Sequence, residues 1–217
     1  MLVRDYMTRH PVMVEPEMSI VEAQGIMAEA KVRHLPVIES GKRLVGLVTR
    51  ERMRIPPTEL GSLNVWEITR LLSNLTIKDV MAKREQVVTV EPDAPLEKAA
   101  QIMVESKVGC LPVLEEGVVV GIITETDLLA HLTEMMATRL PGVRATVRMP
   151  NRKGELAKLV AAISAQGWGI LACGGVTAPK EPDKWEAVVK IRDVPKEEVV
   201  AVLGQVQGQE IVDVREV

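Results

Sequence analysis

The sequence predicts an α+β protein, an α/β sandwich made of two repeated units and followed by a smaller domain of different pattern. The first observation is an internal repeat: residues 3–53 match residues 77–128 at corresponding positions. The second is a change of pattern after Gly142, where strand-like and helix-like stretches follow in the order βαββαβ. A hydrophobic content of 47% with 26% charged residues fits an ordinary globular chain. A repeat at fixed spacing indicates one supersecondary unit used twice, because a single copy cannot cover its own apolar face.

The first copy, in residues 1–55, is expected to contain a strand, a helix and a strand hairpin, then a last helix stopped at Pro56-Pro57. Val12–Val14 is predicted to be a short strand ended by Pro16. Ser19 with Glu22 forms a capping box that opens a helix with apolar residues at helical spacing. Strands at 34–38 and 44–48 are joined by a turn at Ser40-Gly41.

The second copy, in residues 77–139, repeats this order. We expect a strand at 87–90, a helix at 95–106, and strands at 110–114 and 118–123. A longer helix over 125–139 leads to the Pro141-Gly142 break. Between the copies, residues 56–76 form a linker with a short helix over 64–72, whose Trp66 and Leu71 either pack on the repeats or contact a partner.

Residues 142–217 are expected to form a separate domain. Strands are predicted at 143–149, 170–176, 185–191 and 210–214, with helices after Gly154 and over 196–203. This order is typical of the ferredoxin-like fold, an antiparallel sheet with both helices on one face. The uncovered face is free to pair with another subunit.

Composition argues against several classes of function. A net charge of −3 gives no basic surface for phosphate backbones, and a single Tyr leaves little for base stacking, so we expect no nucleic-acid binding. No apolar run approaches the roughly 20 residues of a membrane span. The first repeat begins at Val3, which leaves no room for a signal peptide, and the two cysteines lack CxxC spacing. We therefore expect a cytoplasmic protein with reduced thiols and no membrane association; its low Asn content fits a heat-adapted source.

No catalytic or metal-binding constellation is visible. The three His residues are scattered and do not recur between the copies, and no nucleophile elbow or phosphate-binding glycine loop occurs. We therefore expect neither an enzyme nor a resident cofactor or metal.

The strongest local candidate for a binding site follows the last strand of the second copy. Thr124 ends that strand and Asp127 lies one helical turn further on. A helix N-terminus with a Thr hydroxyl suits a phosphate, and a carboxylate there can accept hydrogen bonds from ribose hydroxyls. The alternative is a plain capping box, because Thr-x-x-Asp also fits that role.

The repeated pattern resembles a known module. Its elements are Asp-x-Met, Val-x-Pro, Lys-Val-x-x-Leu-Pro-Val and Gly-hydrophobic-x-Thr, and over residues 1–139 they are similar to the tandem cystathionine β-synthase (CBS) domain pair. Residues 142–217 resemble an ACT domain through Asn151 to Leu156, although Lys153 stands where that family has Pro. The combination resembles CBS–ACT proteins of the acetoin-utilisation type.

The resemblance implies that an adenosyl ligand, namely AMP, ADP, ATP or S-adenosylmethionine, binds between the repeats. It places Thr124 on phosphate, Asp127 on ribose, and Val88 and Thr89 along the adenine. Replacing Asp127 with Ala is then expected to abolish binding. The corresponding first-copy residues form a degenerate site because an arginine replaces the acidic residue; they are Val12, Met13, Thr49 and Arg52.

A second difference between the copies lies before Leu-Pro-Val, where the first has Arg33-His34 and the second Gly109-Cys110. In CBS pairs this position faces the phosphate region. We hypothesise one composite nucleotide site, with Arg33 and His34 on a phosphate whose ribose Asp127 holds. Alternatively, Arg33 is a solvated cation near a helix end.

The resemblance to an ACT domain implies a second site, where Asn151 and Gly154 offer an amide and close backbone approach to an amino-acid carboxylate. The alternative is a loop that only supports dimerisation. Together these features predict a regulatory sensor that binds an adenosyl small molecule and forms a homodimer. The rival interpretation is a ligand-free scaffold, or a regulatory subunit that controls a partner enzyme without a ligand of its own.

Overall fold

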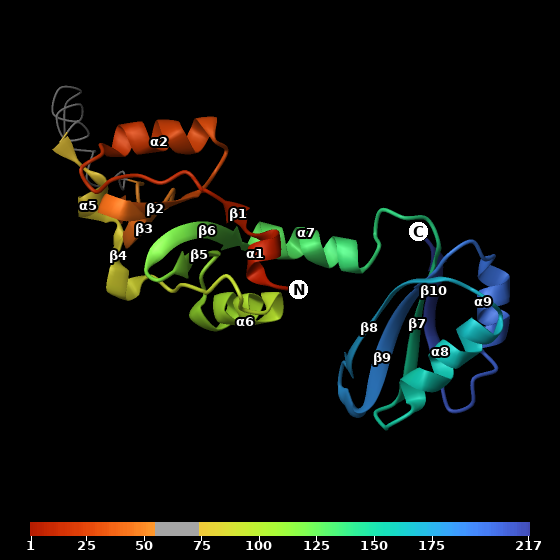
Figure 1. Cartoon of the computed structure of the whole chain (residues 1–217). Coiled ribbons are helices and arrows are strands. Elements are labelled where there is room, and N and C mark those ends of the chain that lie inside the picture. Colours follow the sequence, from red (N-terminus) through yellow and green to blue (C-terminus); the bar gives the residue numbers. More distant parts are fainter. Residues whose placement is uncertain (55–73) are drawn as a thin grey trace, which may run out of the picture. The chain divides into compact units, whose positions relative to one another are not determined.

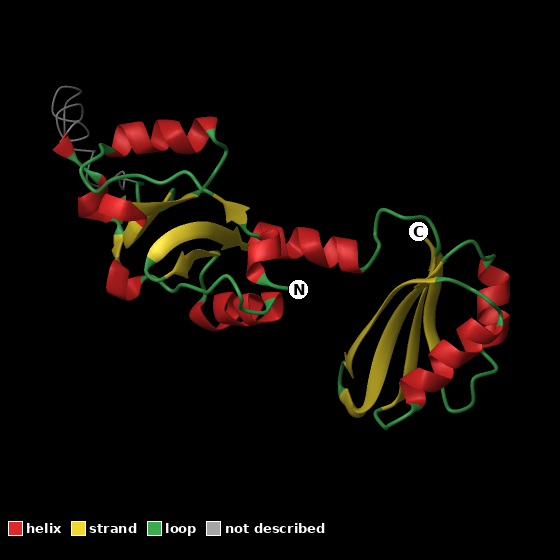
Figure 2. Ribbon diagram, in the orientation of Figure 1, coloured by secondary structure: helices red, strands yellow, loops and turns green. Residues whose placement is uncertain are grey.

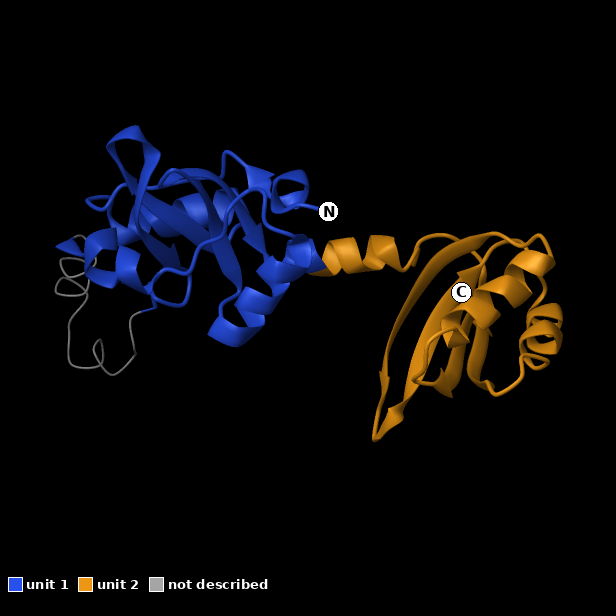
Figure 3. Cartoon of the chain, turned by 60° about the horizontal axis from the view of Figure 1, so that its bottom comes forward, with its two compact units in different colours: residues 1–128 blue, residues 129–217 orange. Residues whose placement is uncertain are grey.

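The computed structural model describes residues 1–54 and 74–217, and they form two compact units, residues 1–128 and 129–217 (Figure 3). The linker helix predicted over 64–72, with Trp66 and Leu71, and the end of the first copy's last helix lie outside the described residues. Within the described part of the chain, no helix is long and apolar enough to cross a bilayer. The chain combines a first unit of α+β type with a second unit built on a four-stranded antiparallel sheet.

Three helices of the two repeats begin where the sequence predicts. Helix α2 (Ile20–Glu29) is capped by Ser19, whose hydroxyl oxygen accepts a hydrogen bond from the backbone N–H of Glu22 at 3.1 Å. Helix α6 spans Leu96–Ser106. Helix α7 (Glu125–Met135) ends earlier than the predicted residue 139, because Ala137 adopts a left-handed conformation with φ 50° that cannot continue a helix.

Each repeat contributes one strand hairpin to a single sheet (Figure 1). The first hairpin joins β2 (His34–Glu39) to β3 (Arg43–Thr49), and the second joins β5 (Cys110–Glu115) to β6 (Val118–Thr124). Strands β3 and β6 pair at Arg43 and Val118, which joins the two repeats. The repeats also contain the 3₁₀ turns η1 (Ser40–Lys42) and η2 (Arg84–Gln86).

The strands predicted at 12–14 and 87–90 are wrong in extent, because each forms a single parallel bridge. Val14 pairs with Val37, and Val90 pairs with Val113. Pro16 and Pro92 follow two residues later and carry no N–H to extend the ladder.

The segment in front of each repeat packs on the other repeat. Helix α1 (Val3–Tyr6) and strand β1 (Thr8–Arg9) precede the first repeat, yet β1 pairs with β6 of the second. Helix α5 (Ile77–Val80) and strand β4 (Ala82–Lys83) precede the second repeat, yet β4 pairs with β3 of the first. The buried cores follow the same exchange: Val3 belongs to the second repeat's core and Ile77 to the first's. Neither repeat therefore has a complete core without the other.

Two glycines of the repeat motif make this crossing possible. A Cβ on Gly46 would lie 2.6 Å from the sulfur of Met81 and 2.7 Å from the carbonyl oxygen of Ala82. A Cβ on Gly121 would lie 2.4 Å from the sulfur of Met7. Each methionine of the Asp-x-Met motif thus lies against the glycine of the opposite repeat, which explains why both residues recur.

The second unit has the predicted order of elements (Figure 2). Its sheet has the order β10-β7-β9-β8 with every neighbouring pair antiparallel, and both helices cover one face. The core lies between sheet and helices and includes Leu159, Ile163, Val199 and Leu203. The elements are β7 (Val143–Pro150), α8 (Glu155–Ala165), β8 (Ile170–Ala178), β9 (Glu181–Ile191), α9 (Lys196–Leu203) and β10 (Glu210–Glu216).

Candidate functional site

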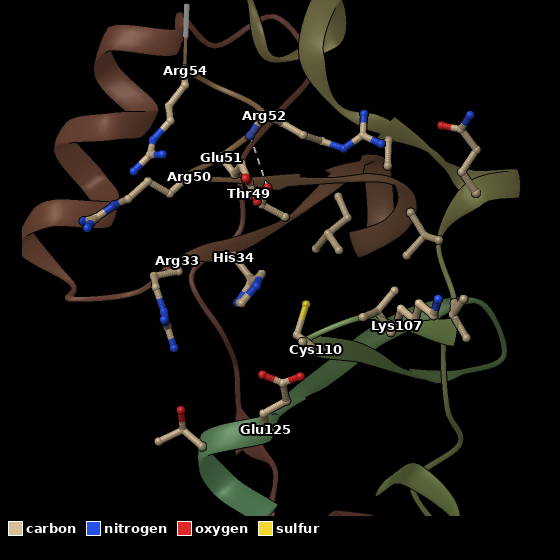
Figure 4. Close-up of a pocket in the computed structure, with 18 residues that line it drawn as sticks. Arg33, His34, Thr49, Arg50, Glu51, Arg52, Arg54, Lys107, Cys110 and Glu125 are labelled. Carbon is tan, nitrogen blue, oxygen red and sulfur yellow. Dashed lines mark hydrogen bonds between the residues drawn. The ribbon is translucent and has the colours of Figure 1, made fainter. Parts of the chain in front are cut away.

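A cavity of about 570 Å³ lies inside the first unit, between the two repeats (Figure 4). The first repeat lines it with the residues that begin β2, the end of β3 and the turn that follows β3. The second repeat contributes the start of β4, the end of η2 with the segment after it, the residues before and at the start of β5, and the first turn of α7. The lining residues are Arg33, His34, Leu47, Thr49, Arg50, Glu51, Arg52, Arg54, Ala82, Gln86, Val87, Val88, Lys107, Val108, Gly109, Cys110, Glu125 and Thr126.

Five residues predicted from the sequence meet at this cavity: Arg33, His34, Thr49, Arg52 and Val88. Val88 of the second repeat therefore shares a cavity with Thr49 and Arg52 of the first. From the sequence, Val88 was expected to share a site with Thr124 and Asp127 instead. The exchange of segments explains the difference, because β4 carries the chain of the second repeat alongside β3 of the first. The remaining predicted residues are absent from this lining: Val12, Met13, Thr89, Thr124 and Asp127.

Cationic groups dominate the polar part of the cavity. Five cations, namely Arg33, Arg50, Arg52, Arg54 and Lys107, line it against two carboxylates, Glu51 and Glu125. Within residues 1–54 and 74–217, none of the five forms an ion pair. Unpaired cations gathered in one concave site favour an anionic ligand, because the walls concentrate their field.

The rest of the lining is apolar. Leu47, Ala82, Val87, Val88 and Val108 come from both repeats and provide a surface on which a flat ring can pack. Val87 and Ala82 also belong to the buried cluster at the junction of the two hairpins, so this wall is part of the core. A cavity with one apolar wall and one cationic part suits a ligand with a ring at one end and a charge at the other.

Thr124 and Asp127 satisfy each other's hydrogen-bonding groups. The Asp127 carboxylate accepts hydrogen bonds from the Thr124 N–H at 2.8 Å and from its hydroxyl at 2.7 Å. The Asp127 N–H donates to the Thr124 hydroxyl oxygen at 3.4 Å. These are the bonds of a capping box, the alternative that the sequence left open.

At the equivalent place in the first repeat, the Thr49 hydroxyl can still donate a hydrogen bond. The Arg52 N–H donates to the Thr49 hydroxyl oxygen at 3.3 Å, but Arg52 has no carboxylate to accept a hydrogen bond in return. Within the described residues, no acceptor is recorded for the Thr49 hydroxyl hydrogen. Thr49 can therefore donate to an anion in the cavity.

His34 and Cys110 occupy equivalent positions in the two repeats, and both side chains point into the cavity (Figure 4). Burial lowers the pKa of His34, and the neighbouring Arg33 lowers it further, while Glu125 opposes them. Burial, with a contribution from Glu125, raises the pKa of the Cys110 thiol to about 12. At neutral pH His34 is therefore mainly neutral and Cys110 is a thiol.

Five charged lining residues were not predicted from the sequence: Arg50, Glu51, Arg54, Lys107 and Glu125. A signal for two of them was present. Arginines at 50, 52 and 54 alternate along the chain directly after a strand, and a run of cations at a strand end would have indicated an anion site.

The loop predicted to bind an amino acid lies between β7 and α8. Asn151 and Gly154 are both exposed, and Gly154 has φ 90°, a conformation that favours glycine. The Asn151 N–H donates to the Asp183 carbonyl oxygen at 2.8 Å. A second cavity, of about 510 Å³, includes neither residue and is lined by Pro141, Gly142, Val143, Asp193, Val194, Glu216 and Val217.

No group of three or more His, Cys, Asp or Glu side chains among the described residues is arranged to hold a metal ion.

Comparison with known proteins identifies the first unit. The sequence pattern that defines the CBS domain matches residues 3–54 and 77–134. This chain belongs to the CBS-domain family. Its CBS pair therefore comprises both repeats, and no ACT-domain match accompanies it in the C-terminal region.

Solved structures resemble the CBS pair. An acetoin utilization protein (AcuB) from Vibrio cholerae superposes with a TM-score of 0.52 at 29% identity, covering 64% of this chain and 95% of that one. CBSX2 of Arabidopsis thaliana in complex with AMP gives 0.51 at 27% identity, covering 60% and 95%. The CBS pair of protein MJ0100, in complex with 5′-methylthioadenosine and S-adenosyl-L-methionine, gives 0.50 at 26% identity, covering 61% and 95%.

Curated relatives match about three fifths of this chain. A homoserine O-acetyltransferase of Methanohalobium evestigatum is 33% identical over 135 residues, which are 61% of this chain and 24% of that protein. The CBS domain-containing protein YhcV of Bacillus subtilis is 28% identical over 129 residues, 59% of this chain and 84% of YhcV. The chain thus spans about a quarter of the length of the first of these relatives.

Proposed function

We propose that this protein is a regulatory sensor whose CBS pair binds an adenine nucleotide in the 570 Å³ cavity. The observation that carries the proposal is the set of unpaired cations beside an apolar wall in one cavity. CBS pairs of similar structure bind AMP in one case and S-adenosyl-L-methionine in another. The cationic lining favours the phosphate-bearing ligands AMP, ADP and ATP over S-adenosylmethionine, whose sulfonium is itself a cation.

The adenine would pack on the apolar wall that includes Val87 and Val88. The phosphate would lie where the Thr49 hydroxyl can donate and where Arg33 and His34 enter the lining. Arg33 then supplies a charge-assisted hydrogen bond, which is stronger than a neutral one. The phosphate and ribose roles predicted for Thr124 and Asp127 stay predictions, since these residues lie outside the cavity lining.

Isothermal titration calorimetry with AMP, ADP, ATP and S-adenosylmethionine tests the proposal. We expect the three nucleotides to bind more tightly than S-adenosylmethionine. Replacing Arg33 with Ala should lower the affinity for AMP by at least roughly tenfold, because a hydrogen bond to a charged group contributes about 1.5–3 kcal/mol. Lys98→Ala is the matched control: Lys98 is an exposed cation on α6 outside the cavity.

Failure of all four compounds to bind would contradict the proposal and favour a scaffold that acts without a ligand. Such a scaffold could still hold a partner enzyme, and neither role requires the chain itself to be an enzyme.

The C-terminal unit would serve as an ACT domain that pairs two chains. Its βαββαβ order and antiparallel sheet support this assignment. Strands β8 and β10 are the edges of that sheet, so their outer hydrogen-bonding groups can pair with a second copy. Sedimentation equilibrium of the whole chain tests for the dimer, and titration with amino acids tests Asn151 and Gly154 as an effector site.

A further inference from the structure

The arginines after β3 divide the cavity into two cationic parts. Arg52 extends in the opposite direction from Arg50 and Arg54 (Figure 4). Its Nη1 lies 3.5 Å from the carbonyl oxygen of Val80, two residues before the lining residue Ala82. Arg52 therefore belongs to the apolar side of the cavity, away from Arg50 and Arg54.

In the proposed pose Thr49 and Arg33 bind the 5′-phosphate, and the Arg52 guanidinium, which extends toward Val80, is left for another part of the ligand. A nucleotide with its base on the apolar wall brings its ribose next to that wall, since the ribose is bonded directly to the base. A guanidinium on this side meets the ribose edge of the ligand, where an unphosphorylated nucleotide carries only hydroxyl groups. A neutral hydroxyl does not require a second cation, whereas a phosphate does, because guanidinium binds phosphate through two parallel hydrogen bonds.

The two repeats show the change of charge directly. The residue equivalent to Arg52 in the second repeat is Asp127, a carboxylate. In dinucleotide-binding folds a carboxylate accepts hydrogen bonds from a free ribose 2′-hydroxyl, and an arginine accommodates a 2′-phosphate. The same physical choice applies to any site that meets the ribose edge of an adenosine.

We infer that the cavity selects an adenosine nucleotide with a second phosphate on its ribose, at the 2′ or 3′ position, in addition to the 5′-phosphate. The inference rests on the proposed function, because it assumes that an adenosine ligand occupies this cavity. It names a narrower class of ligand, in which Arg52 binds the ribose phosphate while Thr49 and Arg33 bind the 5′-phosphate.

Three isomers provide the test. ADP, adenosine 2′,5′-bisphosphate and adenosine 3′,5′-bisphosphate have the same atoms and differ only in the place of the second phosphate. By calorimetry, one of the two bisphosphates should bind at least roughly tenfold more tightly than ADP, and more tightly than ATP. The Arg52→Gln variant should lose this preference, because a neutral amide cannot replace the guanidinium on the ribose phosphate.

The outcomes separate the two claims. Tighter binding of ADP or ATP than of both bisphosphates would overturn the inference and leave the proposed nucleotide site intact. An unchanged preference in Arg52→Gln would also overturn it, because another group would then hold the ribose phosphate. If no adenosine compound binds, the proposed function fails and the inference fails with it. Lys98→Ala should preserve both the affinity and the preference of the wild type.

Discussion

The ends of β3 and β6 share one backbone design and differ in a single decisive side chain. Each strand ends at a threonine whose hydroxyl oxygen accepts a hydrogen bond from the N–H three residues on. In the second repeat the Asp127 carboxylate accepts hydrogen bonds from both the N–H and the hydroxyl of Thr124. In the first repeat Arg52 has no carboxylate that could accept a hydrogen bond from Thr49, and its guanidinium adds a cation to the cavity.

This comparison shows how a duplicated unit can acquire one site instead of two. The capping box at Thr124 stabilises its own helix, and the same hydrogen bonds make its donors less accessible to a ligand. The Thr49 end lacks that local stabilisation, and its hydroxyl hydrogen can donate to an anion. We expect fold stability and ligand binding to be divided between the two repeats in this way.

The largest effect should come from the crossing segments, where the two repeats can be compared at matched glycines. Gly46→Ala should lower the free energy of unfolding by about 2–3 kcal/mol, because the new methyl would meet the Ala82 backbone as well as Met81. Gly121→Ala should cost about 1 kcal/mol less, since its closest contacts are with the flexible side chain of Met7. Urea unfolding monitored by circular dichroism measures both. Equal costs would show that the two crossings are packed alike.

A smaller difference in the free energy of unfolding is expected between substitutions at the ends of β6 and β3. Asp127→Ala should destabilise the protein by about 1 kcal/mol, because it removes the carboxylate of the capping box. Arg52→Ala should change the free energy of unfolding by less than about 0.5 kcal/mol, because the side chain is exposed and makes one long hydrogen bond. Thermal unfolding of the two variants side by side checks this; a larger loss in Arg52→Ala would reverse our assignment of the two ends.

The smallest effect concerns His34 and Cys110 at equivalent positions. The folded-state pKa of His34 lies below its ordinary value of about 6.5, so the unfolded chain takes up the proton first as pH falls. The contribution of His34 to stability is thus present above about pH 6.5 and is lost as pH falls through the folded-state pKa. His34→Gln should flatten the decline in unfolding free energy between about pH 7 and 5. Cys110→Ser should leave it unchanged, because the Cys110 thiol is neutral throughout that range. An equal decline in wild type and His34→Gln would contradict this view.

The sequence predicted the elements of the fold well, for a physical reason. The N-cap at Ser19, the hairpins around Gly41 and Gly117 and the βαββαβ order all depend on local signals. The exchange of segments between the repeats is a long-range packing choice that no local pattern specifies. It explains why Val88 was grouped with Thr124 and not with Thr49.

The cavity residues were predicted only in part for the same reason. Arg33, His34, Thr49 and Arg52 stood out because they differ from their counterparts or belong to the repeated motif. Lys107 was missed because it matches Lys31 in the other repeat and so signalled no difference. Which copy of a repeated residue lines a cavity depends on how the two units pack together.

The most direct test of the central claim replaces the same residue in each repeat. AMP is titrated by calorimetry into Thr49→Val and Thr124→Val, with circular dichroism to confirm that both variants fold. If the nucleotide binds beside Thr49 of the first repeat, Thr49→Val should lower the affinity for AMP by roughly tenfold, since a donor to the phosphate is lost. The affinity of Thr124→Val for AMP should stay within about threefold of wild type. A loss confined to Thr124→Val would contradict this account and place the nucleotide at the second repeat.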